Sequence, residues 1–266
     1  MNQDNVHRNF GGQAQPGDVA PYVLLASSKD RVRKVVSHWT SARQVADHYE
    51  FLLYSGEYAG RRISCCSTGI GGMSVAIAVE ELAALQASTF LRVGVTRPLV
   101  DEQAFGQLTI AKGAVRWDGT SHDYVRPEYP ALAHFEVVLA AISAAENLGF
   151  AYQVGIIGDL ASSGPESSDG YRHFLTRRMA PHKQELYEAG VLNGTGESAT
   201  MFVQSSIYGL RAGTIHVNAY DPEGQLWDPA ADDKVVLAGL ETMRILMEWD
   251  QMKQAQGVPY ITPALA

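Results

Sequence analysis

The chain has 266 residues, of which 46% are hydrophobic and 19% charged, and a formal net charge of -8. This length suits one large α/β domain, and the composition is that of an ordinary globular protein rather than a disordered chain or a disulfide scaffold. The negative charge opposes nonspecific binding to nucleic acid or anionic membranes but permits a local cationic pocket. We therefore expect one domain over residues 1–266 that binds a small molecule, not nucleic acid or a membrane.

The amino-terminal region and the cysteines both indicate a cytoplasmic protein. The first twenty residues are polar, and the longest later apolar stretch, 74–91, is interrupted by Glu80 and Glu81. Neither an export signal nor a membrane span is therefore expected. Cys65 and Cys66 are adjacent in an apolar run of strand character, which directs their side chains to opposite faces. We expect both thiols to be reduced packing residues.

Apolar runs of strand length alternate with segments of helical period, the pattern of a mainly parallel sheet covered by helices. The predicted strands are 22–26, 50–58, 61–67, 89–95, 152–158 and 211–218, and the predicted helices are 30–39, 74–86, 130–148, 198–208 and 232–250. The second and third strands form a hairpin that turns at Ala59 and Gly60. Ser28 is a candidate N-cap for the first helix, and Gly209 stops the fourth. A loop rich in Ser, Gly and Pro, 161–170, could cover a pocket.

A glycine-rich turn at Gly69, Gly71 and Gly72 joins a predicted strand to a predicted helix. Such a turn lets the backbone approach a ligand closely, and the helix N-terminus favours negative charge. The spacing matches neither the dinucleotide fingerprint nor the P-loop. A tight strand-to-helix connection explains the glycines equally well.

Three charged residues are candidates for a binding site, each with a structural alternative. Arg92 lies in a predicted buried strand, where it needs an anionic partner: either a bound anion or a residue such as Glu81. Arg31 falls in the first turn of a helix, where a solvated arginine is the more common outcome. Glu197 follows a glycine-rich turn and enters an apolar helix, so it could accept hydrogen bonds from sugar hydroxyls or simply cap the helix.

Several segments occur in the order and spacing of one known family. They are Ser67-Thr68-Gly69-Ile70-Gly71-Gly72, Ile77-Ala78-Val79-Glu80-Glu81-Leu82, Thr89-Phe90-Leu91-Arg92-Val93-Gly94, Val115-Arg116-Trp117-Asp118-Gly119, Glu197-Ser198-Ala199-Thr200 and Gly209-Leu210-Arg211-Ala212-Gly213. Over nearly the whole chain they resemble the uridine phosphorylases of the nucleoside phosphorylase superfamily. The resemblance implies an α/β fold, a single-domain three-layer α/β/α sandwich. It also implies a homohexamer built from homodimers and an active site completed by the neighbouring subunit.

Carried over residue by residue, the resemblance implies roles for individual side chains. Glu197 matches the carboxylate that binds the ribose hydroxyls, and His7 matches the histidine that the neighbour offers to the 5′-hydroxyl. Arg31 and Arg92 match phosphate-binding arginines, so Glu197 and Arg92 are the candidate catalytic pair. No organic cofactor is expected. A monovalent cation between dimer partners, potassium by expectation, is implied by the oxygen ligands of Glu50, Ile70 and Ser74.

The sequence departs from the family pattern in the anion site. Ser27 replaces a glycine of the first phosphate loop, and Tyr49 stands where a neighbour's phosphate-binding arginine is expected. Val95 replaces a threonine that contacts phosphate and sugar, and Arg97 replaces a glycine, where it either compensates for the lost contacts or blocks the site. Weakened phosphate binding is the expected consequence.

The base pocket departs further from the family. The glutamine and arginine that read uracil fall in 165–169, which contains neither, and Ser163 in the same loop is a candidate pocket residue. The aspartate that protonates the base in purine-specific relatives corresponds to Asn218, with Asp221 nearby but displaced. Uracil specificity is therefore not expected from these residues.

Three functions remain open on the sequence alone. The first is cleavage or transfer at the N-glycosidic bond of a nucleoside-like substrate, with phosphorolysis slightly favoured over hydrolysis. The second is a repurposed scaffold that catalyses another small-molecule reaction in specialised metabolism. The third is a noncatalytic ligand-binding homologue, because a fold does not by itself decide function.

Overall fold

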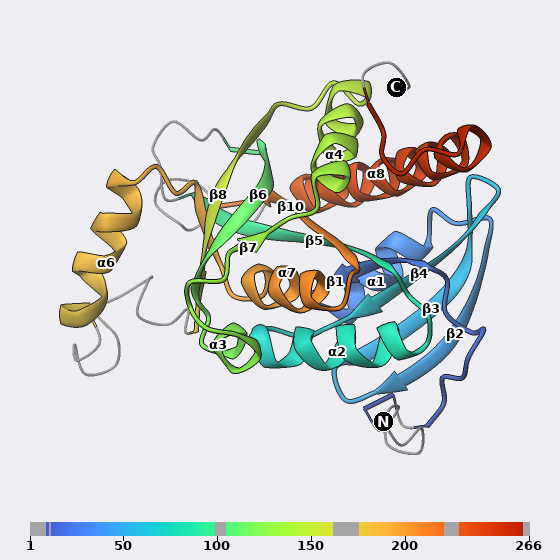
Figure 1. Ribbon diagram of the computed structural model, residues 1–266, viewed down its shortest axis with the longest axis horizontal. Helices are drawn as coiled ribbons and strands as arrows, with labels where there is room; N and C mark the ends of the chain where they lie inside the picture. The colour runs from blue at the N-terminus through green and yellow to red at the C-terminus, as the bar shows by residue number, and fades with distance from the viewer. Residues whose placement is uncertain (1–8, 11, 99–104, 162–175, 221–228, 263–266) are drawn as a thin grey trace.

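The computed structural model describes residues 9–10, 12–98, 105–161, 176–220 and 229–262. Within these ranges, a ten-stranded sheet lies between two layers of helices (Figure 1). The strands are β1 (Tyr22–Ala26), β2 (Ser41–His48), β3 (Phe51–Tyr58), β4 (Arg61–Ser67), β5 (Thr89–Pro98), β6 (Leu108–Trp117), β7 (Ala131–Leu132), β8 (Tyr152–Leu160), β9 (Asn193–Thr195) and β10 (Arg211–Asn218). The helices are α1 (Lys29–Val36), α2 (Gly72–Ala84), α3 (Thr120–Tyr124), α4 (Phe135–Asn147), α6 (Thr176–Glu188), α7 (Ser198–Ile207) and α8 (Pro229–Gln256).

The sheet is mixed and partly closed. β1 lies between β4 and β5 and is parallel to both, and β5 is also parallel to β10. Beyond β10, the antiparallel strand β6 leads through β8 and β9 back to β5, so five strands form a ring. The other edge continues from β4 into antiparallel β3 and β2. The sheet is therefore mixed rather than mainly parallel: β1, β4, β5 and β10 are parallel neighbours, as are β6, β8 and β9, and antiparallel pairs join and extend these groups.

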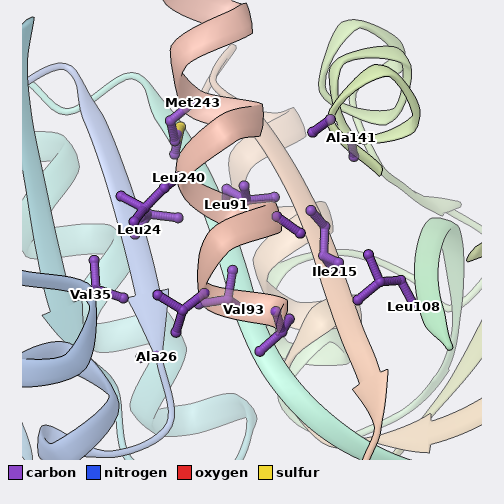
Figure 2. Close-up of a cluster of buried hydrophobic side chains, with 14 of the residues drawn as sticks. Leu24, Ala26, Val35, Leu91, Val93, Leu108, Ala141, Ile215, Leu240 and Met243 are labelled. Carbon is purple, nitrogen blue, oxygen red and sulfur yellow. The ribbon is translucent and has the colours of Figure 1, made fainter. Parts of the chain in front are cut away.

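Apolar side chains fill both faces of the central strands. Leu24 and Leu91 belong to the core cluster under α8, together with Leu240 of that helix (Figure 2). The alternate residues Val23 and Phe90 belong to the cluster under α2 and α7. Strands buried on both faces have continuous apolar sequences, which is why this region was predictable. Cys65 and Cys66 likewise divide between the two clusters as predicted, and both are free thiols.

Most predicted elements are confirmed, with two shortened helices, of which the one predicted over 30–39 ends at Val36. Ser28 caps α1 by accepting a hydrogen bond from Arg31 N, and the hairpin turns at Ala59 and Gly60, both with positive φ. The helix predicted over 130–148 begins only at Phe135, because the preceding residues form β7 against β6. β2, β6, β7, β9 and α6 were not predicted. Among the described helices, none has the length and apolar character needed to cross a membrane.

Candidate active site

The site forms where β5 and β10 lie side by side and the α7 N-terminus meets the glycine-rich turn after β4. Arg92 and Glu197 meet here, with Arg92 Nη2 2.9 Å from Glu197 Oε2. Their side chains are only 4% and 6% exposed, so each buried charge depends on the other. Glu81 is not the partner of Arg92; it accepts hydrogen bonds from the backbone of Asn9 and Phe10 instead. The predicted alternative of a structural ion pair is thus present, with Glu197 rather than Glu81 as the partner of Arg92.

Glu197 does not act as a side-chain cap. It occupies the N-cap position of α7, but its carboxylate makes no capping hydrogen bond to that helix. Gly71 N donates to Oε1 and Gly196 N donates to Oε2, both at 3.1 Å. The glycine-rich turn and Arg92 thus hold the carboxylate in a fixed orientation. The capping interpretation is wrong, and a fixed carboxylate remains available for another role.

Arg31 and Ser27 come together at the start of α1. Arg31 Nη1 donates to Ser27 Oγ at 2.7 Å, and Arg31 Nε donates to Asp232 Oδ1 of α8 at 2.6 Å. Arg31 is only 5% exposed, so it is not a solvated residue of a helical turn. Asp232 also lies 3.3 Å from Lys34 Nζ. Within this chain, the charge of Arg31 is therefore already opposed by a carboxylate.

The residues predicted to hold a cation lie at or beside the glycine-rich turn. Ser74 Oγ donates to Glu50 Oε1 at 3.0 Å and lies against the carbonyl oxygen of Thr68. Ile70 is 83% exposed on the same turn. Tyr49 is also exposed, with a φ of 50° and its ring against His48. Glu50 and Ser74 are thus brought together as predicted, in an oxygen-rich environment that suits a hard cation.

The predicted pocket residues at the ends of β5 and β10 lie close together. Val95 pairs with Val217 in the sheet register, and Asn218 pairs with Thr96. Arg97 places its guanidinium carbon 5.3 Å from the ring centre of Tyr220, a cation–π contact just beyond β10. These positions form one edge of the candidate site. His7, Ser163, Asp221 and the loop residues 165–169 lie outside the described residues.

Comparison with known proteins identifies the family. The sequence profile described as "Phosphorylase superfamily" matches residues 21–217. The chain belongs to the phosphorylase superfamily. It is 43% identical over 247 residues to a uridine phosphorylase of Thermococcus kodakarensis, covering 91% of this chain and 88% of the relative. It is 35% identical over 198 residues to the uridine phosphorylase of Escherichia coli, covering 74% and 78%. A guanosine phosphorylase of Halorubrum lacusprofundi is 32% identical over 202 residues, covering 76% and 78%.

The structure adds two buried residues to this phosphorylase-superfamily site that the sequence reasoning missed. His216 of β10 is fully buried, with Nε2 3.1 Å from Arg92 Nη1. Burial lowers the pKa of His216 well below its ordinary value, and the charges of Arg92 and Arg31 lower it further. A histidine within a predicted buried strand was the available signal. Asp232 carried no such signal, because its role depends on the packing of α8 against α1.

Asp159 at the end of β8 supports the α7 N-terminus from behind. It is fully buried and accepts hydrogen bonds from Ala199 N and Thr195 Oγ1. Burial raises the pKa of Asp159 well above its ordinary value; Glu197 and Asp118 raise it further, while the Ala199 hydrogen bond opposes the shift. A buried carboxyl group with a raised pKa thus lies behind the Glu197 turn. Strand β8 was predicted, but the single Asp in it was not singled out.

Proposed function

We propose that the chain is a nucleoside phosphorylase, an enzyme of the pentosyltransferase class that transfers a ribosyl group from a base to phosphate. The observation that carries this proposal is the buried pair of Arg92 and Glu197. Glu197 presents a carboxylate held by two backbone N–H groups, the type of group that accepts hydrogen bonds from ribose hydroxyls. The uridine and guanosine phosphorylases among its relatives support the same reaction class.

The reaction needs an anion next to the sugar carbon. A phosphate oxygen bonds to C1′ of the ribose as the C1′–N bond breaks. The electron pair of that bond leaves with the base, whose nitrogen then takes a proton from solvent. The sugar gains positive charge during this step, so hydrogen bonds from its hydroxyls to Glu197 strengthen. Arg92, already paired with Glu197, is suited to orient the phosphate against C1′.

The anion site is weaker than the family pattern implies. Ser27, Tyr49 and Val95 stand where family contacts to phosphate are expected, and Arg31 shares its charge with Asp232. Phosphorolysis is nevertheless favoured over hydrolysis, because Arg31 is buried facing Ser27 and a serine at the first loop is a poor base for activating water. We therefore assign phosphate as the nucleophile, bound with modest affinity.

Assembly is the second part of this proposal. Ile70 and Met73 are exposed apolar side chains beside Glu50 and Ser74. Such a surface suits a homodimer interface that encloses a potassium ion, with further association into a hexamer. In this arrangement, His7 and Tyr49 of a neighbouring subunit complete the site. Two buried reduced cysteines suit the cytoplasm as the location.

The direct test is a screen of purine and pyrimidine nucleosides with and without phosphate, analysed by chromatography. We expect free base together with ribose 1-phosphate, formed only when phosphate is present. Free base with free ribose would instead indicate hydrolysis. If no nucleoside yields product, the chain is a repurposed scaffold or a ligand-binding homologue.

A further inference from the structure

His216 lies next to Arg92, although the proposed reaction does not by itself require a histidine there. β10 runs parallel to β5, and His216 pairs with Gly94 in the register, two residues beyond Arg92. A Cβ atom at Gly94 would lie 2.7 Å from Arg92 Nη1 and 3.1 Å from His216 Cδ2. The missing side chain of Gly94 therefore leaves the space in which the guanidinium group and the imidazole ring meet.

The contact fixes the plane of the guanidinium group. Arg92 Nη2 pairs with Glu197, and Arg92 Nη1 lies 3.1 Å from His216 Nε2. A guanidinium group held at one nitrogen can rotate about its long side chain, whereas one held at both terminal nitrogens has a fixed plane. The two partners come from the N-cap position of α7 and from β10, and both side chains are buried.

The histidine must be neutral to make this contact. Its Nε2 can accept a hydrogen bond from Arg92 only when that nitrogen carries no proton. Burial and the nearby charges of Arg92 and Arg31 favour the neutral ring. The proton then resides on Nδ1, which is buried and has no hydrogen-bond partner among the described residues. An unpaired buried N–H is unfavourable, so stability alone does not account for histidine at this position.

We propose that His216 is a positioning residue that holds Arg92 in the orientation required to bind an anionic nucleophile beside Glu197. This inference rests on the proposed function. His216 itself touches neither substrate nor reacting atoms. It acts as a neutral acceptor that places one guanidinium edge against Glu197 and keeps the group from turning away, so that the site is organised before phosphate binds.

The test uses three substitutions that differ in where they place an acceptor. His216→Gln places an amide near the position of Nε2, His216→Asn places one near Nδ1, and His216→Phe keeps the ring but has no acceptor. Calorimetric titration of the full-length protein with inorganic phosphate measures binding without turnover. We expect the phosphate Kd to rise roughly tenfold in the Asn and Phe variants and to stay within about threefold of the wild type in the Gln variant.

Thr214→Val is the matched control on the same strand. Thr214 is buried, and its hydroxyl contacts Ser198 Oγ at 3.2 Å rather than the Arg92 guanidinium. Its phosphate Kd should match that of the wild type. Folding of each variant is checked by thermal unfolding, and the Gln and Asn variants decide the outcome if the Phe variant does not fold.

Each result has a defined meaning. Equal phosphate affinity in the wild type and the folded Asn or Phe variant would overturn the positioning role of His216, even if the enzyme is a phosphorylase. An equal rise of the phosphate Kd in the Gln and Asn variants would also overturn it, because the position of the acceptor would then not matter. If the variants bind phosphate as expected but the enzyme cleaves no nucleoside, the proposed function is wrong, whereas the role of His216 in positioning Arg92 is supported. A wild type that binds no phosphate would overturn both.

Discussion

Glu197 and Arg92 are individually unusual because both are buried charges that neutralise each other. Removing either one leaves an uncompensated charge in a dry environment, which is strongly destabilising. Any substitution of either residue therefore needs a check of folding, and the substitution at Glu197 keeps the shape of the side chain and is compared between two ligands.

Glu197→Gln should weaken a ribosyl ligand more than the matched ligand that lacks the 2′-hydroxyl. The lost contact is a charge-assisted hydrogen bond to that hydroxyl, and the expected difference is about 1.5 to 3 kcal/mol. Isothermal titration calorimetry with both ligands measures it. If binding of the two ligands weakens equally, Glu197 stabilises the local structure instead of binding the 2′-hydroxyl.

Asp232→Asn should strengthen phosphate binding. The Asp232 carboxylate pairs with Arg31 and repels an approaching dianion, so its removal is expected to lower the phosphate KM by roughly fivefold, in the range of one modest charge interaction. Asp233→Asn is the control, because Asp233 is exposed and pairs only with Lys34 among the described contacts. A KM that rises in the Asp232 variant would show that the carboxylate positions Arg31 rather than opposing the anion.

The sequence identified Arg92, Glu197 and Arg31 but not all of their partners. Arg92 could be singled out because a guanidinium within an apolar strand is conspicuous. His216 and Asp232 were not linked to the arginines, since His216 is 124 positions from Arg92 and Asp232 is 201 positions from Arg31. Such contacts depend on how β10 and α8 pack, which no local pattern records.

At the level of elements, helix α7 is the structure on which the site depends. Its N-terminus is held from behind by Asp159, and Thr200 in its first turns donates to Asp118. Asp118 also accepts from Ser121 N and Oγ, so α3 is joined to the same network. The Glu197 turn is thus supported by buried carboxyl groups from two different strand ends.

Asp159 should make the stability of the fold depend on pH. Because its folded pKa is raised, the folded state holds a proton that the unfolded chain releases above about pH 4, so this contribution to stability is present at low pH and is lost as pH rises. Asp159→Asn cannot ionise and should lack this component. Urea unfolding at several pH values measures it. If the two proteins lose stability in parallel as pH rises, Asp159 is ionised in the fold.

Several of the longer strands were predictable, and short or interrupted strands were not. β1, β4 and β10 have the predicted bounds; β1 is apolar throughout, whereas β4 and β10 also contain arginines and polar residues. β6 is interrupted by a register shift between Ala111 and Gly113, and β9 has only three residues. The start of α4 was misplaced because Pro130 precedes a two-residue strand rather than a helix.

At the level of the whole molecule, the resemblance predicted the three layers and the family correctly. The ring of β5, β10, β6, β8 and β9 was not predicted, because it depends on long-range pairing. The expectation against uracil specificity and the association of subunits stay predictions. The loop 165–169, where base contacts are expected from the resemblance, lies outside the described residues.

Association should depend on the exposed turn at Ile70. Light scattering at micromolar concentration is expected to show a dimer or hexamer that is stabilised by potassium relative to a bulky organic cation. Ile70→Asp should reduce association with little change in monomer stability, because this side chain is 83% exposed in the single chain. If the wild type is monomeric at these concentrations, the proposed cation site at Glu50 between subunits is wrong. The proposed contribution of His7 and Tyr49 to a neighbour's site is then wrong as well.

The phosphate dependence of nucleoside cleavage in the wild type and in Arg92→Ala tests the central claim most directly. We expect the wild type to release ribose 1-phosphate, and the variant to raise the phosphate KM by at least about tenfold, since it loses a charge-assisted contact to the anion. Thermal unfolding of the variant verifies that it is folded despite the unpaired Glu197. Cleavage that yields free ribose, does not depend on phosphate and is unaffected by loss of Arg92 would contradict a phosphorolytic reaction at this site.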